Sequence, residues 1–162
     1  MFLHHFFTRP MVPGPEIDLK LKERFGPDKT VGSDETLVYG IYLCGTREMI
    51  GYVSLRLGES PGLYYLGHIG YRIEEGHRGH GFAAKAVRML LPFMRRLGLR
   101  TVVITTDTDN IPSRKTCERL GCDLERVAPV PPKYLGLCMM SPAKCRYIFA
   151  VVSGETAEGA AV

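Results

Sequence analysis

A glycine-rich segment, residues 73–83, has the residue types of an anion-binding loop. Its sequence, Ile-Glu-Glu-Gly-His-Arg-Gly-His-Gly-Phe-Ala, joins a strand-like stretch to a helix-like stretch. Glycine lets the backbone approach a ligand without a Cβ in the way, and the first N–H groups of the following helix point at negative charge along the helix dipole. Arg78 and His80 add cationic character at the same place. The segment therefore predicts a site for a diphosphate.

Glycine spacing alone leaves a second interpretation open. Gly76, Gly79 and Gly81 would equally form a tight turn before a helix. Two common phosphate loops do not match, since the chain has no G-x-x-x-x-G-K-[ST], and a dinucleotide loop would need glycine where Ala84 stands. The loop must therefore be assigned from its wider sequence context.

Two blocks of sequence, in order along the chain, supply that context. Arg78-x-x-Gly81-x-Ala83 fits the pattern [QR]-x-x-G-x-[GA], and residues 109–122 are similar to N-x-x-[SA]-x-x-x-[Y]-x-x-x-G-[F]. Both patterns belong to the GNAT superfamily of acyl-CoA-dependent N-acyltransferases, which this chain resembles. The run His68-Ile69-Gly70-Tyr71 further resembles the branch that includes the ribosomal-protein N-terminal acetyltransferases.

The resemblance implies acetyl-CoA (coenzyme A) as the cofactor and assigns residues to it. The loop would hold the diphosphate, the backbone N–H of Ile73 would stabilise the oxyanion, and the backbone at Tyr71 would lie along the pantetheine. Asn110 would hold the pantetheine amide, although a helix N-cap explains it as well; Ser113 either assists or only occupies the first helical turn. The residues assigned to cofactor binding are Tyr71, Ile73, Arg78, Gly79, His80, Gly81, Phe82, Ala83, Asn110 and Ser113.

Two residues are candidates for moving protons. An alkylamine with a pKa of ~10.4 is mostly ammonium at neutral pH, so a base or a water chain must take its proton. We expect His68 to be that base, because it lies where the resembling enzymes often place a glutamate; a structural histidine is the alternative, and Glu74 and Glu75 are second choices. Cys117 aligns with the family's frequent tyrosine, the proton donor to the thiolate, and is otherwise a small buried hydrophobe.

Composition is that of one ordinary globular domain. The chain has 162 residues, of which 45% are apolar. Its five cysteines form no C-x-x-C pair, so no metal site and no disulfide framework is expected, and a reducing cytoplasm is the expected location. The first seven residues lack a basic segment and a sustained apolar stretch, and no 18-residue apolar run occurs, so we expect no secretory leader and no membrane partner.

Charge concentrates near the two motifs. The formal net charge is +4, and residues 78–126 hold ten Lys or Arg against five Asp or Glu. This excess would attract the phosphates of coenzyme A, although most such charges belong to solvated faces; Arg114 and Lys115 are the exceptions we expect. No nucleic-acid partner is expected. The partner is a small-molecule or peptide amine, and a homodimer is left open.

The elements around these residues indicate one α+β domain, an α/β sandwich. We expect a mixed, mostly antiparallel central sheet of about six to seven strands flanked by helices. Residues 1–15 form an irregular N-terminal arm, 16–152 the GNAT-like domain, and 153–162 a disordered tail. A kink is expected at Pro92 within the first long helix. Strands are expected at 17–21, 37–43, 49–57, 65–73, 101–106, 124–130 and 144–152, and helices at 81–97 and 110–120.

The function expected from these observations is transfer of an acetyl group from acetyl-CoA to a primary amine, by direct attack in a ternary complex. The acceptor would be a peptide N-terminus or a small molecule. Two alternatives remain. One is a transferase that uses another acyl-CoA, and the other is a module that binds coenzyme A with little or no turnover, because the family's tyrosine is replaced at Cys117.

Overall fold

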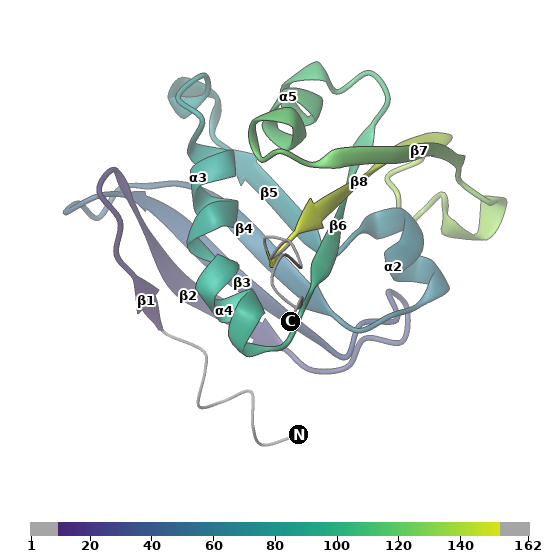
Figure 1. Cartoon of the computed structure of the whole chain (residues 1–162), viewed down its shortest axis with the longest axis horizontal. Coiled ribbons are helices and arrows are strands. Elements are labelled where there is room, and N and C mark those ends of the chain that lie inside the picture. Colours follow the sequence, from purple (N-terminus) through teal and green to yellow (C-terminus); the bar gives the residue numbers. More distant parts are fainter. Residues whose placement is uncertain (1–9, 153–162) are drawn as a thin grey trace, which may run out of the picture.

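The computed structural model describes residues 10–152. In this part of the chain, eight strands form one sheet flanked by helices (Figure 1). The strands are β1 (Met11–Val12), β2 (Ile17–Phe25), β3 (Glu35–Leu43), β4 (Met49–Leu57), β5 (Ile69–Ile73), β6 (Thr101–Asp107), β7 (Asp123–Pro129) and β8 (Ala143–Ala150). The helices are α2 (Pro61–Leu66), α3 (Phe82–Met89), α4 (Leu91–Arg96) and α5 (Ile111–Arg119), with short 3-10 turns η1 (Glu75–His77) and η2 (Pro132–Tyr134).

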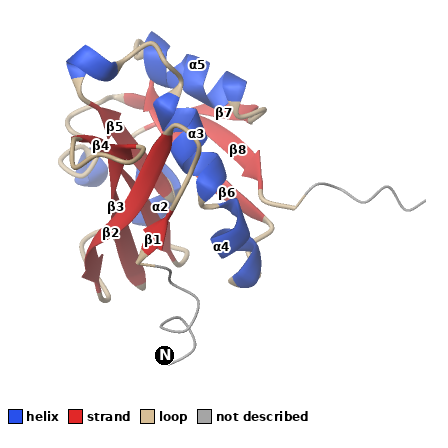
Figure 2. Ribbon diagram, turned by 90° about the vertical axis from the view of Figure 1, so that its left-hand side faces the viewer, coloured by secondary structure: helices blue, strands red, loops and turns tan. Residues whose placement is uncertain are grey.

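The strand order is β1-β2-β3-β4-β5-β6-β8-β7, and every neighbouring pair is antiparallel except β5 and β6. Alternating side chains make one sheet face apolar, as the fully buried Leu37, Tyr39 and Ile41 of β3 illustrate. The helices α3 and α4 cover that face (Figure 2) and contribute Val87 and Met94 to the core. The predicted mixed α+β sheet is therefore confirmed.

The number of strands is eight rather than six to seven, because part of the predicted irregular arm joins the sheet. Met11 and Val12 pair antiparallel with Lys20 and Leu19 of β2. The prolines on either side, Pro10 and Pro13, keep β1 to two residues, because proline donates no ladder hydrogen bond. The first nine residues of that arm and the predicted tail at 153–162 lie outside the described residues.

The predicted strand at 65–73 begins too early, because its first residues belong to α2. Ser60 caps this helix by accepting a hydrogen bond from the Leu63 N–H at 3.0 Å, and Pro61 occupies the first turn. Gly67 ends the helix at φ +82°. Of the predicted strand, only β5 is extended. The helix-capping residues Ser60, Pro61 and Gly67 therefore decided the local structure, and the apolar pattern of residues 65–73 did not.

The predicted helix at 81–97 is divided in two at Pro92. Helix α3 ends at Met89 and α4 begins at Leu91, with Pro92 in the first turn of α4. Proline lacks the N–H that would continue the α3 ladder, so the expected kink becomes a break. The predicted helix at 110–120 is confirmed as α5, with Asn110 as its N-cap.

Candidate active site

The sheet opens between β5 and β6. These parallel strands are paired only at Ile69 and Ile104, and beyond that pair they diverge. The N–H of Glu74 donates to Ile50 O at 2.8 Å, just beyond the C-terminal end of β5. Because strand hydrogen bonding alternates, even-numbered residues of β5 face β4 and the backbone groups of Tyr71 and Ile73 face the opening.

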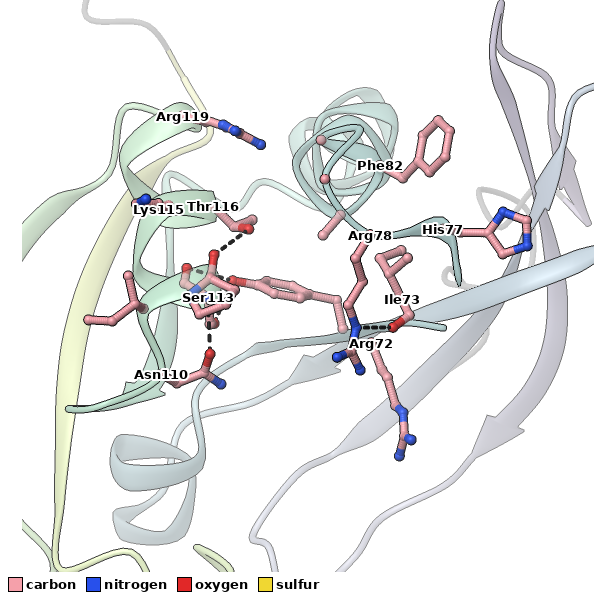
Figure 3. Close-up of a pocket in the computed structure, with 16 residues that line it drawn as sticks. Arg72, Ile73, His77, Arg78, Phe82, Asn110, Ser113, Lys115, Thr116 and Arg119 are labelled. Carbon is pink, nitrogen blue, oxygen red and sulfur yellow. Dashed lines mark hydrogen bonds between the residues drawn. The ribbon is translucent and has the colours of Figure 1, made fainter. Parts of the chain in front are cut away.

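A cavity of about 520 Å³ occupies this opening. Three segments form its walls: the C-terminal half of β5, the loop leading into α3, and the N-terminal half of α5 (Figure 3). Its lining residues are Tyr71, Arg72, Ile73, His77, Arg78, Gly79, Gly81, Phe82, Ala83, Asn110, Ile111, Pro112, Ser113, Lys115, Thr116 and Arg119. The two sequence motifs, about 30 residues apart, therefore face each other across one cavity.

The loop has a conformation that requires glycine. Gly79 has φ +87° and Gly81 has φ +72°, both in the left-handed region. Gly81 is the N-cap of α3 and offers no side-chain hydrogen bond to the helix, so the first-turn N–H groups remain available to an anion. Arg78 fixes the start of the loop, since its Nε donates to Ile73 O at 2.9 Å. The loop therefore has the backbone conformation on which the predicted anion site depends, and anion binding itself stays a prediction.

The electrostatic character of the cavity is cationic. Arg72, His77, Arg78, Lys115 and Arg119 line it, and none of the described residues around it is Asp or Glu. Figure 3 shows Lys115 and Arg119 on α5, opposite the side of the cavity that carries Arg78. Such a cavity suits a polyanionic ligand.

The start of α5 closes the second wall. Asn110 caps the helix by accepting a hydrogen bond from the Ser113 N–H at 3.1 Å through its Oδ1. Both residues also line the cavity, so the capping role of Asn110 and a role in ligand binding are compatible. The Tyr71 hydroxyl reaches across from β5 and lies 2.9 Å from Ser113 Oγ.

Nine of the ten residues assigned to the cofactor line this cavity. The exception is His80, which stacks at a tilt on Phe82 with the ring centroids 5.3 Å apart. Its carbonyl accepts a hydrogen bond from Lys85 Nζ at 3.1 Å. A contribution of His80 to ligand binding is therefore confined to its backbone and to the outer surface of the loop.

The structure does not bring His68 to the cavity. Its side chain is buried (9% exposed), with Nδ1 accepting a hydrogen bond from the Val103 N–H at 3.0 Å. The proton must then be on Nε2, which lies 3.1 Å from Gly58 O and 3.2 Å from the carboxylate of Glu59. With both ring nitrogens engaged, His68 has no lone pair for an amine proton, and the geometry favours the structural alternative.

Cys117 does not line the cavity either and lies behind Tyr71. It is fully buried at 0% exposure and lines neither this cavity nor the smaller one described below. Its Sγ lies 3.8 Å from the Tyr71 hydroxyl, which separates it from the opening. Burial raises the pKa of Tyr71 well above its ordinary value, so that hydroxyl keeps its proton and acts as a hydrogen-bond donor.

A second, smaller cavity of about 200 Å³ lies beside the first and shares Tyr71, Asn110 and Ser113 with it. Three strands supply most of its wall: β4, β5 and β6. Its lining residues are Tyr52, Arg56, Leu66, Ile69, Gly70, Tyr71, Ile104, Thr105, Thr106, Asp107, Asn110, Ser113 and Lys144. Two compartments thus meet at Tyr71.

Sequence reasoning named Lys115 together with Arg114 and missed Pro112, Thr116 and Arg119 as lining residues on α5. Pro112, Lys115, Thr116 and Arg119 lie at helical positions i, i+3, i+4 and i+7, which share one face. That spacing could have separated Lys115 from Arg114, which turns away to donate to Tyr147 Oη at 3.2 Å. Glu74 and Glu75, the second choices for a base, line neither cavity.

Two kinds of feature are absent from residues 10–152. No group of three His, Cys, Asp or Glu residues there is arranged to hold a metal ion. No helix of that part is long and apolar enough to cross a membrane.

Known structures with similar folds are acetyltransferases. The ribosomal L7/L12 alpha-N-protein acetyltransferase RimL matches with a TM-score of 0.61 and 17% identity, over 86% of this chain and 93% of its own. The microcin C7 self-immunity acetyltransferase MccE gives 0.55 and 23% identity, and the ribosomal-protein-S5-alanine acetyltransferase of Vibrio fischeri gives 0.57 and 21%. These last two matches cover 71% of this chain but only 61% of each relative. At these identities they show the fold.

Sequence comparison identifies the family. No curated protein matches the sequence significantly. The model of the acetyltransferase (GNAT) domain matches residues 6–123, most of the chain. Both motifs used above fall within that range, and so do all the residues that line the larger cavity. The chain therefore belongs to the GNAT acetyltransferase family, whose members are acyl-CoA-dependent N-acetyltransferases.

Proposed function

We propose that this protein transfers the acetyl group of acetyl-CoA to a primary amine by direct attack within a ternary complex. The observation that carries the proposal is the pair of adjoining cavities. The larger one is cationic and has the anion-binding loop, and the smaller one meets it at Tyr71. One compartment suits the coenzyme and the other suits the acceptor, so both substrates would be held at once.

The residues of the larger cavity fit coenzyme A. Gly79 and Gly81 bring backbone N–H groups to the mouth of α3, where a diphosphate is favoured. Lys115 and Arg119 supply further positive charge from α5. Acetyl-CoA, when bound, supplies the thioester that the amine attacks. The protein's part is to hold the diphosphate, orient the chain that follows it, and offer donors to the reacting centre.

Two donors are available near the meeting point of the cavities. The backbone N–H of Ile73 faces the opening and is the candidate oxyanion donor. The Tyr71 hydroxyl stays protonated and donates to the Ser113 carbonyl at 3.2 Å; turned from that carbonyl toward the departing sulfur, it is the candidate donor that replaces Cys117. Hydrogen-bond donation of this kind does not need full proton transfer, since a thiolate with a pKa near 8.5 is a stable leaving group.

Amine deprotonation is assigned to water. His77 lines the larger cavity but is paired with Glu48 at 3.0 Å, and Asp107 in the smaller cavity is paired with Lys144. Burial by itself would raise the pKa of Asp107. Hydrogen bonds from Lys144 and Ser141, together with the charge of Lys144, outweigh that effect and hold the pKa below its ordinary value, so this carboxylate is a weak proton acceptor. An amine that reaches the site already neutral needs no side-chain base.

A coenzyme A-binding module is the second candidate. It is favoured by the positions of His68 and Cys117, which leave the site without either expected proton carrier. Purified protein incubated with acetyl-CoA and a broad panel of amines decides between the two. Release of free thiol that depends on the amine supports the transferase. Calorimetric binding of coenzyme A without thiol release across the panel supports the module. Replacing acetyl-CoA by longer acyl-CoAs in the same assay tests the acyl preference.

A further inference from the structure

The smaller cavity contains a guanidinium with no carboxylate partner. Arg56 on β4 makes one long hydrogen bond, from Nη1 to Gly67 O at 3.4 Å. In the part of the chain described here, no carboxylate lies within 4 Å of that guanidinium. Burial lowers the pKa of Arg56 below its ordinary value, which reflects the cost of holding this cation away from water. An anion placed beside it would offset that cost.

The neighbouring strand is shaped to admit this guanidinium. A Cβ at Gly70 of β5 would lie 3.1 Å from Nη2 and 3.2 Å from Nη1 of Arg56, and 2.9 Å from Ser54 Oγ. The φ of Gly70 is not positive, so glycine is required here for space and not for backbone conformation. Arg56 therefore lies against β5 one residue before Tyr71, where the two cavities meet.

A second polar group in this cavity also lacks a partner. Thr106 on β6 is 3% exposed, and its buried Oγ1 makes no hydrogen bond within residues 10–152. Buried hydroxyls are nearly always hydrogen-bonded, so this one indicates a ligand position. Thr106 and Arg56 both line the smaller cavity, and they come from strands on either side of β5.

The charges of the cavity disfavour polycationic acceptors. Lys144 forms an ion pair with Asp107, which leaves Arg56 as the uncompensated charge among the described lining residues. A polyamine or an aminoglycoside would bring several positive charges against it. An acceptor that carries a carboxylate would gain the bidentate pairing for which guanidinium groups are suited.

We propose that the smaller cavity binds the acceptor as an amino carboxylate, with its carboxylate on Arg56 and its amine directed to the opening at Tyr71 and Ile73. This inference rests on the transferase function proposed above and names its acceptor class. The cavity, at about 200 Å³, has the volume of about seven water molecules. This volume suits a small acceptor such as a free amino acid.

Matched acceptors test the proposal. Values of kcat/KM for a panel of L-amino acids are compared with those for the corresponding amino acid amides, which keep the amine and lose the carboxylate. Wild-type protein is expected to prefer the carboxylate form by about tenfold or more, after correction for the fraction of free amine. In R56Q the preference falls to about twofold, through loss on the carboxylate form alone. R56K keeps the positive charge but loses the planar guanidinium that can donate two parallel hydrogen bonds to a carboxylate, so we expect it to give an intermediate preference.

Controls separate this inference from the function on which it rests. R47Q removes an exposed arginine that lines neither cavity and leaves the preference unchanged. Coenzyme A affinity, measured by calorimetry, stays within about twofold in R56Q and shows that the protein is folded. If amides are acetylated as well as amino acids, or if R56Q loses both alike, the acceptor assignment is wrong while the transferase function stands.

Binding measurements cover the case in which no amine is acetylated. Wild-type protein with coenzyme A bound is then titrated with the same amino acids and amides. Heat that requires the carboxylate and disappears in R56Q supports the site without turnover. No heat with any amino acid overturns the proposal, whereas coenzyme A binding itself remains a separate result.

Discussion

Tyr71 on β5 and Ser113 on α5 join the two walls of the larger cavity, with their hydroxyl oxygens 2.9 Å apart. Tyr71 also lines the smaller cavity, so it lies where the two compartments that we propose for coenzyme and acceptor meet. The contact connects α5 to β5 and holds the Tyr71 side chain between these two walls of the larger cavity. One hydrogen bond thus links the geometry of the site to its proposed chemistry.

Tyr71→Phe removes this hydroxyl and keeps the ring. We expect kcat to fall about tenfold, equivalent to about 1.4 kcal/mol, because a donor to the departing sulfur is lost. Coenzyme A affinity is expected to change by less than about twofold. Tyr42→Phe is the matched control, because Tyr42 lines neither cavity. An unchanged kcat in Y71F would limit Tyr71 to a structural role, and a 100-fold loss in C117S would restore the assignment to Cys117.

Gly81→Glu is expected to abolish coenzyme A binding, with an affinity loss of at least about 100-fold, or about 2.7 kcal/mol. The substitution places a carboxylate at the N-terminus of α3 and strains a backbone at φ +72°. Gly76→Glu is the control on the same loop, since Gly76 has no positive φ and does not line the cavity. Calorimetry with coenzyme A measures both variants, and equal affinities would refute the loop assignment.

Lys115→Gln and Arg119→Gln are each expected to weaken coenzyme A binding about two- to fivefold at low salt, the scale of an exposed ion pair. Both side chains line the larger cavity, whereas Arg114 donates to Tyr147 and Thr108 instead. Arg114→Gln should therefore leave the affinity unchanged. Raising the salt concentration should reduce the difference between wild type and K115Q. Equal losses in all three variants would point to general charge and not to this helix face.

His68→Ala is expected to lower stability by about 1–3 kcal/mol, because it leaves the buried N–H of Val103 without its acceptor. His68→Asn, which can supply an amide oxygen near the position of Nδ1, should recover part of that loss. Urea unfolding measures both variants. Turnover of the folded protein should keep the wild-type pH profile, and loss of an inflection near pH ~6.5 in H68A would instead support the catalytic role.

The pH dependence of kcat/KM is expected to follow the free amine. Below the pKa of the acceptor, the neutral fraction rises about tenfold for each pH unit, so log kcat/KM rises with a slope near one. The raised pKa of Tyr71 keeps its hydroxyl protonated as the pH rises, so Tyr71 gives no falling limb through its ordinary range. Acceptors with different pKa values should shift the curve accordingly. A midpoint that stays fixed for all acceptors would reveal a side-chain base.

The conformation of the glycine-rich loop could be predicted from the sequence because its determinants are local. Gly79 and Gly81 allow left-handed backbone conformations that other residues rarely adopt, and the start of α3 follows at once. The N-cap of α5 at Asn110 is local in the same way. Position 92 showed the limit of such reasoning, since a proline predicts an interruption but packing decides between a kink and a break.

Contacts between distant segments were decided by the tertiary structure. Tyr71 and Ser113 are 42 residues apart, and no periodicity indicates that their side chains meet. His68 has a residue type suited to catalysis, but the Val103 N–H and the Gly58 carbonyl fix its ring away from the cavities. The sequence alone determined the backbone conformation of the glycine-rich loop and of the α5 N-cap, and it identified the GNAT family. Which side chains face the opening depended on how β5, β6 and α5 pack, because orientation follows from neighbours that only folding brings together.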